Sequence, residues 1–369
     1  YDSPSLPITW DRVEYVEGQN EYIPIRPEVK KNIDQMYAQA DSALENGNPE
    51  AMNELKEQFG ENPYELKNIL KYWVRSDKEG LRVIPTDSIV MKIDKEAVRR
   101  SGMKIPEALG DSIPEYMTIT LRDANGNPKR ALYKSELMML EMLANANWER
   151  PIYMAITVGS ENHLGMDNHF TQEGLAYRFT PFDTDKLNSK IDSEKMYDNL
   201  MNKFKFGGID KPGIYIDENA MRMCHSHRRI FSQLAQQLIR EGKKDKAKAA
   251  LDYAEKMIPA FNVPYDWQNG AVQMAEAYYQ LGDSTKADDM MKALADKAVE
   301  YLTWYLSMDD NRFSISTREF EYHWAVLDAE VKIMKKYNSK LAEIYAPKVE
   351  ELYNLYAERY ERLQKMEKK

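Results

Sequence analysis

The pattern of apolar and polar positions changes near residue 215 and divides the chain into two parts. From residue 216 to residue 369, apolar residues recur every three or four positions, the spacing of helices that bury one face. Between residues 27 and 215, such stretches alternate with short β-type runs. Residues 1–26 are rich in proline and aromatic side chains and predict an extended strap. The predicted fold class is therefore α+β: a mixed α/β domain with a small sheet, then an all-α domain.

In the mixed domain, capping residues and turn residues mark the ends of most elements. Helices are predicted at residues 27–45, 50–59, 64–75 and 136–147. Strands are predicted at residues 81–85, 88–93, 116–122, 129–133, 151–158 and 174–179. An Asp, Asn, Gly and Pro-rich turn at 123–128 predicts a hairpin between the strands on either side of it. The helix at 136–147 is apolar on almost every side, and the run 151–158 is continuously apolar, so we expect a β-α-β unit whose second strand is buried on both faces.

Two stretches of the helical part match the tetratricopeptide repeat, a helix–turn–helix unit of about 34 residues. Gly242 and Gly282 occupy the turns, and the loop 258–268, with two prolines, accounts for their separation of 40 residues. The repeat positions hold small or large apolar residues: Phe231, Leu234, Ala235, Leu238, Ala247, Leu251 and Ala254, then Ala271, Met274, Ala275, Tyr278, Ala287 and Met291. We predict a tetratricopeptide-like domain over 216–369, with residues 320–363 as capping helices that Pro347 divides. A generic pair of helical hairpins is the alternative.

Composition and charge narrow the possible functions. The 369 residues include 51 Lys and Arg against 60 Asp and Glu, a formal net charge of −9, so we expect no nucleic-acid partner. The single cysteine, Cys224, excludes an intrachain disulfide. No apolar run approaches the roughly 18 residues of a membrane span. Because the chain opens on Tyr1 rather than methionine, we expect it to be a fragment or a processed product.

No phosphate-binding glycine loop, zinc-protease motif, paired cysteine motif or nucleophile elbow is present, so no catalytic residue and no cofactor is predicted. Cys224 and His227 share one face of a predicted helix, but a metal site needs two further ligands, and we predict no metal. The loop after the strand 151–158 is the best candidate for a small polar ligand, since ligands bind beyond the carboxyl ends of strands in open α/β sheets. The candidate residues in and after this loop are His163, Asp167, Asn168, His169, Glu173 and Arg178. The alternative is a loop whose side chains satisfy its own backbone.

Aromatic residues recur at helical spacing in the helical part. Most are expected to pack between helices, His323 and Trp324 among them, but some can line the concave face of the repeats and hold a peptide. The peptide-binding candidates are Tyr278, Tyr301, Trp304 and Tyr305.

Three segments carry a resemblance to a known family. They are the strap at 2–10 and 15–24, the block Leu-Ala-Asn-Ala-Asn-Trp-Glu-Arg-Pro-Ile-Tyr at 143–153, and Phe-Gly-Gly-Ile-Asp-Lys-Pro-Gly-Ile-Tyr at 206–215. The chain resembles the C-terminal, extramembrane part of a family of multi-pass membrane proteins of Bacteroidetes, whose membrane half is similar to protein O-mannosyltransferases. The resemblance implies a position on the periplasmic side of the inner membrane, with the glycosyl-transfer carboxylates in a membrane half that is absent here.

Three functions are consistent with these observations. The first is an accessory domain of a membrane-embedded, glycosyltransferase-like protein, which recruits an acceptor protein, a glycan or a partner subunit. The second is a free-standing helical-repeat adaptor that binds proteins. The third is an enzyme that acts on a small molecule through the loop 161–178, and it requires His163, Asp167 and His169 to converge on one pocket.

Overall fold

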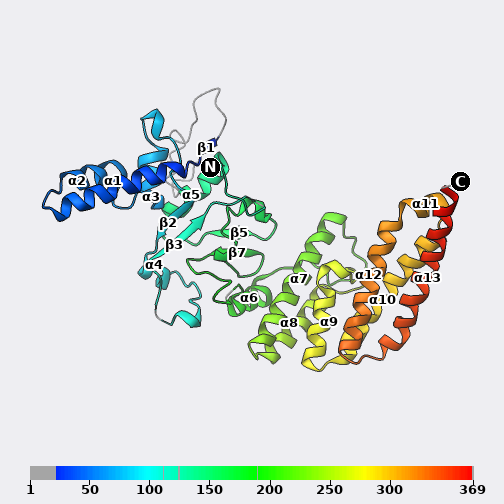
Figure 1. Cartoon of the computed structure of the whole chain (residues 1–369). Helices are drawn as coiled ribbons and strands as arrows, with labels where there is room; N and C mark the ends of the chain where they lie inside the picture. Colours follow the sequence, from blue (N-terminus) through cyan, green and yellow to red (C-terminus); the bar gives the residue numbers. More distant parts are fainter. Residues whose placement is uncertain (1–21, 111, 124, 189, 368–369) are drawn as a thin grey trace. The chain divides into compact units, whose positions relative to one another are not determined.

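The computed structural model describes residues 22–110, 112–123, 125–188 and 190–367, and the chain forms two compact units, Tyr1–Asp192 and Ser193–Lys369 (Figure 1). Most of the predicted strap, residues 1–21, lies outside the described residues. The first unit mixes helices with small sheets, and the second is built from helices. None of the described helices is long and apolar enough to cross a membrane.

The first unit alternates short strands with helices, as the sequence predicts. Its main elements are β1 (Tyr22–Pro24), α1 (Glu28–Glu45), α2 (Glu50–Phe59), α3 (Leu66–Asn68) with the π-helical turn η2 (Ile69–Val74), β2 (Ser88–Lys92), α4 (Lys95–Arg100), β3 (Tyr116–Thr120), β4 (Ala131–Tyr133), α5 (Lys134–Ala146), β5 (Tyr153–Ala155), β6 (Phe170–Gln172) and β7 (Ala176–Phe179). The predicted helices at 27–45, 50–59 and 136–147 are confirmed within two residues at each end. Short 3-10 turns connect several of these elements.

The described strands pair in three small antiparallel sheets. β1 pairs with β4, β2 pairs with β3, and the third sheet has the order β5–β7–β6. The predicted β-α-β unit is wrong, because the strands on either side of α5 belong to different sheets. The predicted hairpin across 123–128 is confirmed at its turn, where Arg122 and Pro128 form an antiparallel bridge and the Asp123 amide donates to the Asn127 carbonyl at 2.9 Å. The Lys129 amide also donates to the Leu121 carbonyl at 3.1 Å. The pairing does not extend further, because β3 and β4 continue to different partners.

The apolar run 151–158 is an edge strand and is not buried on both faces as predicted. Only Tyr153–Ala155 forms β5, and Tyr153 is 44% exposed. Trp148 fixes the turn before it: the indole N–H donates to the Lys92 carbonyl at 3.0 Å, and the ring stacks on Phe179 with centroids 5.5 Å apart. This anchor directs the chain from α5 to the outside of the third sheet, where one face of the strand meets solvent.

The second unit is a series of helices that pack side by side (Figure 1). They are α6 (Ser193–Asp198) with the π-helical turn η7 (Asn199–Lys203), α7 (Glu218–Arg240), α8 (Lys244–Met257), α9 (Ala271–Leu281), α10 (Ser284–Ser307), α11 (Asp310–Ile315), α12 (Thr317–Lys336) and α13 (Leu341–Glu367). α7 packs on α8 and α9 packs on α10, and each pair turns at a glycine with positive φ, Gly242 (76°) and Gly282 (84°). The apolar residues at the predicted repeat positions are buried. The assignment of these pairs as tetratricopeptide repeats stays a prediction.

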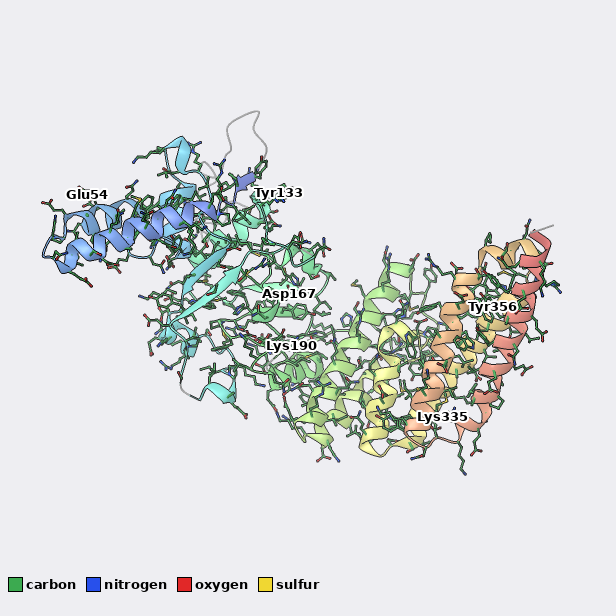
Figure 2. The ribbon with its side chains drawn as sticks, viewed as in Figure 1. Glu54, Tyr133, Asp167, Lys190, Lys335 and Tyr356 are labelled. Carbon is green, nitrogen blue, oxygen red and sulfur yellow. The ribbon has the colours of Figure 1, made fainter. Side chains whose placement is uncertain are left out.

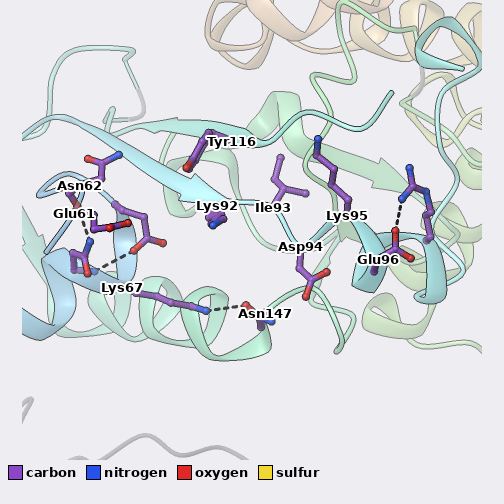
Figure 3. A pocket seen from close by; sticks show the side chains of 13 residues that line it. Glu61, Asn62, Lys67, Lys92, Ile93, Asp94, Lys95, Glu96, Tyr116 and Asn147 are labelled. Carbon is purple, nitrogen blue, oxygen red and sulfur yellow. Dashed lines mark hydrogen bonds and ion pairs between the residues drawn. The ribbon is translucent and has the colours of Figure 1, made fainter. Parts of the chain in front are cut away.

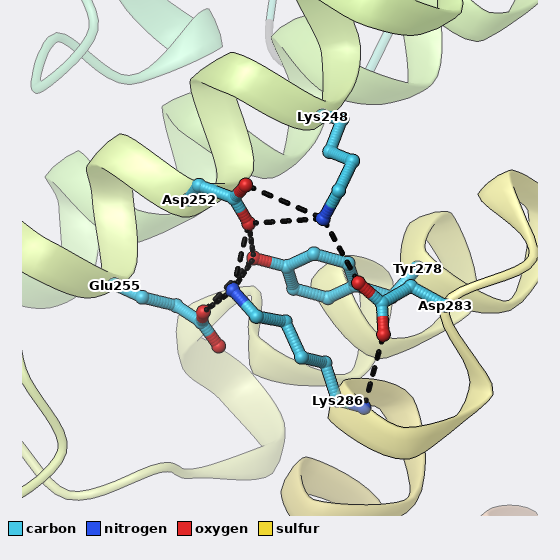
Figure 4. A network of polar contacts seen from close by, with 6 residues as sticks. All are labelled: Lys248, Asp252, Glu255, Tyr278, Asp283 and Lys286. Atoms are coloured by element: carbon cyan, nitrogen blue, oxygen red, sulfur yellow. Dashed lines mark hydrogen bonds and ion pairs between the residues drawn. The ribbon is translucent and has the colours of Figure 1, made fainter.

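A polar network joins α8 to α9 and α10 (Figure 4). The Tyr278 hydroxyl lies 3.0 Å from an oxygen of Asp252 and 2.9 Å from an oxygen of Glu255, and the Lys286 ammonium lies 2.7 and 2.8 Å from the same two oxygens. Burial and the two carboxylates raise the pKa of Tyr278, so the phenol keeps its proton and donates it. The network therefore satisfies a tyrosine that is fully buried between the two helix pairs.

A buried arginine holds the loop between α8 and α9. Arg228 of α7 is 1% exposed, and its guanidinium donates to the carbonyls of Ile258 (2.9 Å), Val263 (2.6 Å) and Pro264 (3.1 Å). Burial lowers its pKa to about 10, which leaves it charged at neutral pH. These three carbonyls belong to a segment without regular secondary structure, so the guanidinium supplies the donors that a helix or sheet would otherwise provide.

The last two helices separate at Asn338 rather than at Pro347. α13 runs through Pro347, so the predicted division there is wrong. Asn338 adopts a left-handed conformation with φ 57° and ends α12, as asparagine often does at a helix terminus. Pro347 removes one backbone hydrogen bond near the start of α13, but contacts with α10 and α12 along the helix outweigh that loss. Tyr356 of α13 (Figure 2) stacks on Phe320 of α12 with centroids 4.5 Å apart.

The helical unit begins at Ser193, upstream of the domain boundary that the sequence places at residue 216. Ser193 is buried, and its hydroxyl donates to Glu241 at 2.6 Å. Glu194 forms ion pairs with Lys243 (2.8 Å) and Lys246 (2.6 Å). These contacts join α6 to the turn between α7 and α8, so the segment that the sequence grouped with the sheets packs with the helices.

Replacing Arg228 with leucine should destabilise the helical unit by roughly 3 kcal/mol or more, because three carbonyls lose a charged donor. Arg229→Leu is the matched control: Arg229 is the next residue of the same helix and is exposed, so we expect a change within about 0.5 kcal/mol. Urea unfolding followed by circular dichroism measures both. Equal losses in the two variants would contradict the role assigned to Arg228.

Candidate functional site

The residues predicted to bind a small ligand separate into three groups in the first unit. In the first group, the His163 imidazole lies 2.7 Å from a carboxylate oxygen of Asp167 and packs its edge against Phe170, with centroids 5.1 Å apart. His163 is buried, whereas Asp167 is exposed beside the third sheet (Figure 2). This contact joins two side chains of the same loop.

The second group, Glu173 and Arg178, is buried and structural. Arg178 is 1% exposed, and its guanidinium donates to the Ser101 carbonyl at 2.8 Å and lies 3.6 Å from the Glu173 carboxylate. The Tyr153 hydroxyl donates to Glu173 at 2.7 Å. Burial, together with that carboxylate, raises the pKa of Tyr153 to about 12. These contacts tie the third sheet to the segment after α4.

The third group, Asn168 and His169, lines a cavity of about 420 Å³ beside the Asp183–Lys186 ion pair. Burial lowers the pKa of His169, so its ring is neutral at pH 7, and within the described chain its Nδ1 has no hydrogen-bond partner. His163 and Asp167 do not line this cavity. The predicted convergence of His163, Asp167 and His169 on one pocket is therefore absent, and the sheet edge on which that prediction depended is antiparallel.

A second concave surface of the first unit is an open groove of about 870 Å³ (Figure 3). Its charged side chains are balanced between basic Lys67, Lys92, Lys95 and Arg99 and acidic Glu61, Glu65, Asp94 and Glu96. Several are already engaged: Lys67 donates to Asn147 at 2.8 Å, and Asp94 accepts from the Ala97 amide at 2.9 Å as the N-cap of α4. None of the polar side chains that line the groove is buried. The groove therefore favours no particular charge.

Cys224 and His227, which share one face of α7, are each engaged by neighbouring groups. Cys224 is buried, which raises the pKa of its thiol, and His227 packs its ring against Phe204 and Phe206 while its Nδ1 lies 2.7 Å from the Met223 carbonyl. In the part of the chain that the structure describes, no three His, Cys, Asp or Glu side chains are placed to hold a metal ion.

The four aromatic residues predicted to bind a peptide differ in accessibility. Tyr278 is fully buried in the network of Figure 4 and offers no surface to a ligand. Tyr305 is 8% exposed, and Trp304, 54% exposed, leans against it with centroids 4.9 Å apart. Tyr301, on the same helix α10, is 36% exposed and stacks on His323 of α12 at 4.4 Å. Of the four, Tyr301 lines a cavity of about 230 Å³ in the helical unit.

That cavity, which we call the aromatic cavity, has a volume of about 230 Å³ between α10, α12 and the loop before α9. Its lining comprises four aromatic rings, three charged groups and four other side chains: Trp267, Tyr301, Tyr322 and His323; Asp266, Lys297 and Glu330; and Gln268, Leu294, Ala298 and Val326. Lys297 pairs with Asp266 at 2.9 Å, and Gln268 donates to the Tyr322 hydroxyl at 2.7 Å. Concave sites with apolar walls and a few polar groups are the usual places for ligands.

Glu330 contributes a buried carboxyl group to the aromatic cavity. The residue is 1% exposed, and one carboxyl oxygen, Oε2, is buried without a hydrogen-bond partner among the described residues. Burial raises its pKa to about 8, and the negative charge of Asp266 acts in the same direction. An unpaired buried carboxyl is costly for a fold, and strongly perturbed pKa values in cavities are concentrated at functional sites.

Sequence reasoning missed Glu330, although a signal for it is present. Glu330 lies three residues after Leu327 and four before Met334, so it shares the apolar stripe of α12. The residues of α12 that are buried are Phe320, Val326, Leu327, Glu330, Val331 and Met334. An acidic residue inside such a stripe marks a buried carboxyl whose partner must come from elsewhere. His323 was expected to pack among helices, and its second role as a cavity wall depends on the tertiary structure.

Comparison with known proteins identifies a family for the first part of the chain. The model of the family described as TMEM260-associated domain 2 matches residues 1–196. The match covers the first compact unit, Tyr1–Asp192, and leaves most of the helical unit outside. No curated protein and no solved structure matches the chain significantly.

Glu330→Gln should change how stability depends on pH. The pKa of Glu330 is about 8 in the folded protein and near the ordinary glutamate value of 4.5 in the unfolded chain, so stability falls as the pH rises from about 5 through 8. Glutamine removes this dependence. We expect the variant to exceed the parent in stability at pH 8.5, by at most roughly 5 kcal/mol, and to match it near pH 5.

Urea unfolding at the two pH values measures the effect, with Glu319→Gln as the control, because Glu319 is exposed on the same helix. A difference between Glu330→Gln and the parent that does not change with pH would show that Glu330 has an ordinary pKa.

Proposed function

The chain belongs to the TMEM260-associated domain 2 family, and from this we propose that it is an accessory, extramembrane part of a TMEM260-like membrane protein that recruits a partner through its helical unit. The name of the family supports an accessory role. The resemblance of the segments 2–24, 143–153 and 206–215 to the extramembrane part of glycosyltransferase-like membrane proteins supports a position on the periplasmic side of the membrane in Bacteroidetes. The recruited partner is an acceptor protein, a glycan or another subunit.

One observation carries the recruiting role. The family match ends close to the end of the first unit, so we treat the helical unit as a separate module. This module has its own ligand-sized cavity, and exposed aromatic rings lie at the rim of that cavity. Paired helices with glycine turns and small buried residues support a tetratricopeptide-like architecture, which typically binds other proteins. Tyr301 and Tyr322, 36% and 42% exposed, provide contact area of the kind enriched at interfaces.

The two other functions have less support. An enzyme that uses the loop 161–178 requires His163 and Asp167 to share the cavity of His169, and they do not line it. A free-standing adaptor remains the alternative, and the open reading frame distinguishes the two. A multi-span region encoded upstream of Tyr1 supports the membrane-bound parent, and its absence would favour the adaptor.

Photocrosslinking in native membranes tests the recruiting role in the intact protein. A photoreactive benzophenone amino acid at position 322, on the rim of the aromatic cavity, should yield one reproducible adduct whose partner segment can be sequenced. The same amino acid at Lys332, an exposed position of the same helix, is the control and should yield none. No adduct at position 322, or the same adducts at both positions, would contradict a recruiting site at this cavity.

A further inference from the structure

The aromatic cavity contains an acid without a counter-ion. Its other charged side chains, Asp266 and Lys297, neutralise each other in an ion pair of 2.9 Å. His323 also lines the cavity, and burial lowers its pKa, so it contributes no positive charge at neutral pH. When Glu330 is ionised, the cavity therefore has one uncompensated negative charge. The side chain that carries it lies in the wall of the cavity and is 1% exposed.

The walls of the cavity suit a positive charge. The faces of Tyr and Trp rings attract cations, and Trp267 and Tyr322 contribute such rings to the lining. Tyr301 is already engaged, because its ring stacks on His323 at 4.4 Å and the Lys297 ammonium lies over it at 5.9 Å. At about 30 Å³ for each water-sized group, a volume of about 230 Å³ accommodates roughly seven such groups, and a lysine side chain has five non-hydrogen atoms beyond Cα. A flexible alkyl ammonium therefore fits in size, in charge and in the nature of its surroundings.

We propose that the aromatic cavity binds one alkyl ammonium group, the side chain of a lysine presented by the partner, with the carboxylate of Glu330 as its counter-ion. The inference names the chemistry of the recruiting site and so rests on the proposed function, but amine binding can be measured without a partner. The ammonium supplies the hydrogen-bond donor that Glu330 Oε2 lacks among the described residues, and the rings of Trp267 and Tyr322 enclose the charge.

Proton release accompanies binding by this arrangement. In the free protein Glu330 has a pKa of about 8 and is mostly protonated at pH 7, whereas a bound ammonium requires the ionised form. The titratable and charged groups around it are Asp266, Lys297, Tyr301, Tyr322 and His323 at the cavity and Tyr345 of α13, whose pKa is raised by burial first, then by Asp296, and least by Glu330. The pKa of Glu330, about 8, lies in the range of pH 7 to 8.5, so we assign a proton released there on binding to Glu330.

Calorimetric titration of the purified chain with N-acetyl-lysine methylamide tests the proposal. Affinity should increase roughly 20-fold between pH 6.5 and 8.5, as the ionised fraction of Glu330 increases, and nearly one proton should be released per amine at pH 7. Glu330→Gln should lower the affinity at pH 8.5 at least tenfold and abolish the pH dependence. Glu319→Gln, exposed on the same helix, should behave as the parent.

Three results would overturn the proposal. They are no binding at millimolar amine, affinity that falls as the pH rises, and equal affinity for the neutral norleucine analogue. A fall with pH would show that protonated Glu330 donates to a neutral ligand instead. If Glu330→Gln does not fold, the pH profile and the proton release of the parent still decide the question.

The outcome is separable from that of the crosslinking experiment. Crosslinking at position 322 without amine binding would retain the recruiting role and reject the ammonium. Amine binding without a crosslinked partner would retain the ammonium site and reject the recruiting role.

Discussion

The three hydrogen bonds that Arg228 donates to the loop between α8 and α9 are the contacts on which the helical unit most depends. The loop spans the thirteen residues 258–270, of which Trp267–Asn269 form a 3-10 turn, and it contains no strand whose carbonyls could join a sheet. A charged, fully enclosed guanidinium supplies the hydrogen-bond donors instead, and the ring of Tyr265 covers it at 5.0 Å. The Pro264 carbonyl also accepts from Asn269 at 3.2 Å, so the carbonyls of Ile258 and Val263 are the ones that would lose their donor without this anchor.

The aromatic cavity follows from the same constraint. Asp266, Trp267 and Gln268 form one of its walls, and they come directly after the carbonyls that Arg228 fixes. Asp266 also begins the 3-10 turn η8 (Trp267–Asn269), because its carboxylate accepts from the Gln268 amide at 3.0 Å. The loop therefore has two roles. It adds residues to the segment that connects the two helix pairs, and it presents side chains opposite α10 and α12. A buried carboxyl that would weaken an ordinary core is thereby placed beside a cavity that a cation can enter.

The sequence predicted local elements better than their assembly. The helices α1, α2 and α5 were predictable because caps, glycine turns and apolar spacing are local signals. The pairing of the strands was not predictable. In the sequence, the turn at 123–128 favours pairing of β3 with β4, but β3 pairs with β2 and β4 pairs with β1, and these choices depend on the tertiary structure. The run 151–158 looked like a central strand, but Trp148 turns the chain to an edge.

The candidate sites show the same difference between what local sequence signals predict and what depends on the tertiary structure. Helical spacing drew attention to Tyr301 and Tyr278 alike and could not separate them, because Asp252 and Glu255, the hydrogen-bond partners of the buried Tyr278, lie on another helix. Glu330 was detectable as an acid in an apolar stripe, yet only the tertiary structure shows that a cavity adjoins it.

The central claim is that Glu330 is a buried, ionisable group that an ammonium ligand can reach, and direct titration of its carboxyl carbon by NMR tests this most closely. With glutamate labelled at the δ carbon and Glu330→Gln used for assignment, we expect a pKa near 8 for Glu330 in the free protein. We also expect saturation with N-acetyl-lysine methylamide to lower that pKa by at least one unit. A pKa near 4.5 in the free protein, or a raised pKa that the amine leaves unchanged, would show that Glu330 is not the counter-ion of a bound ammonium.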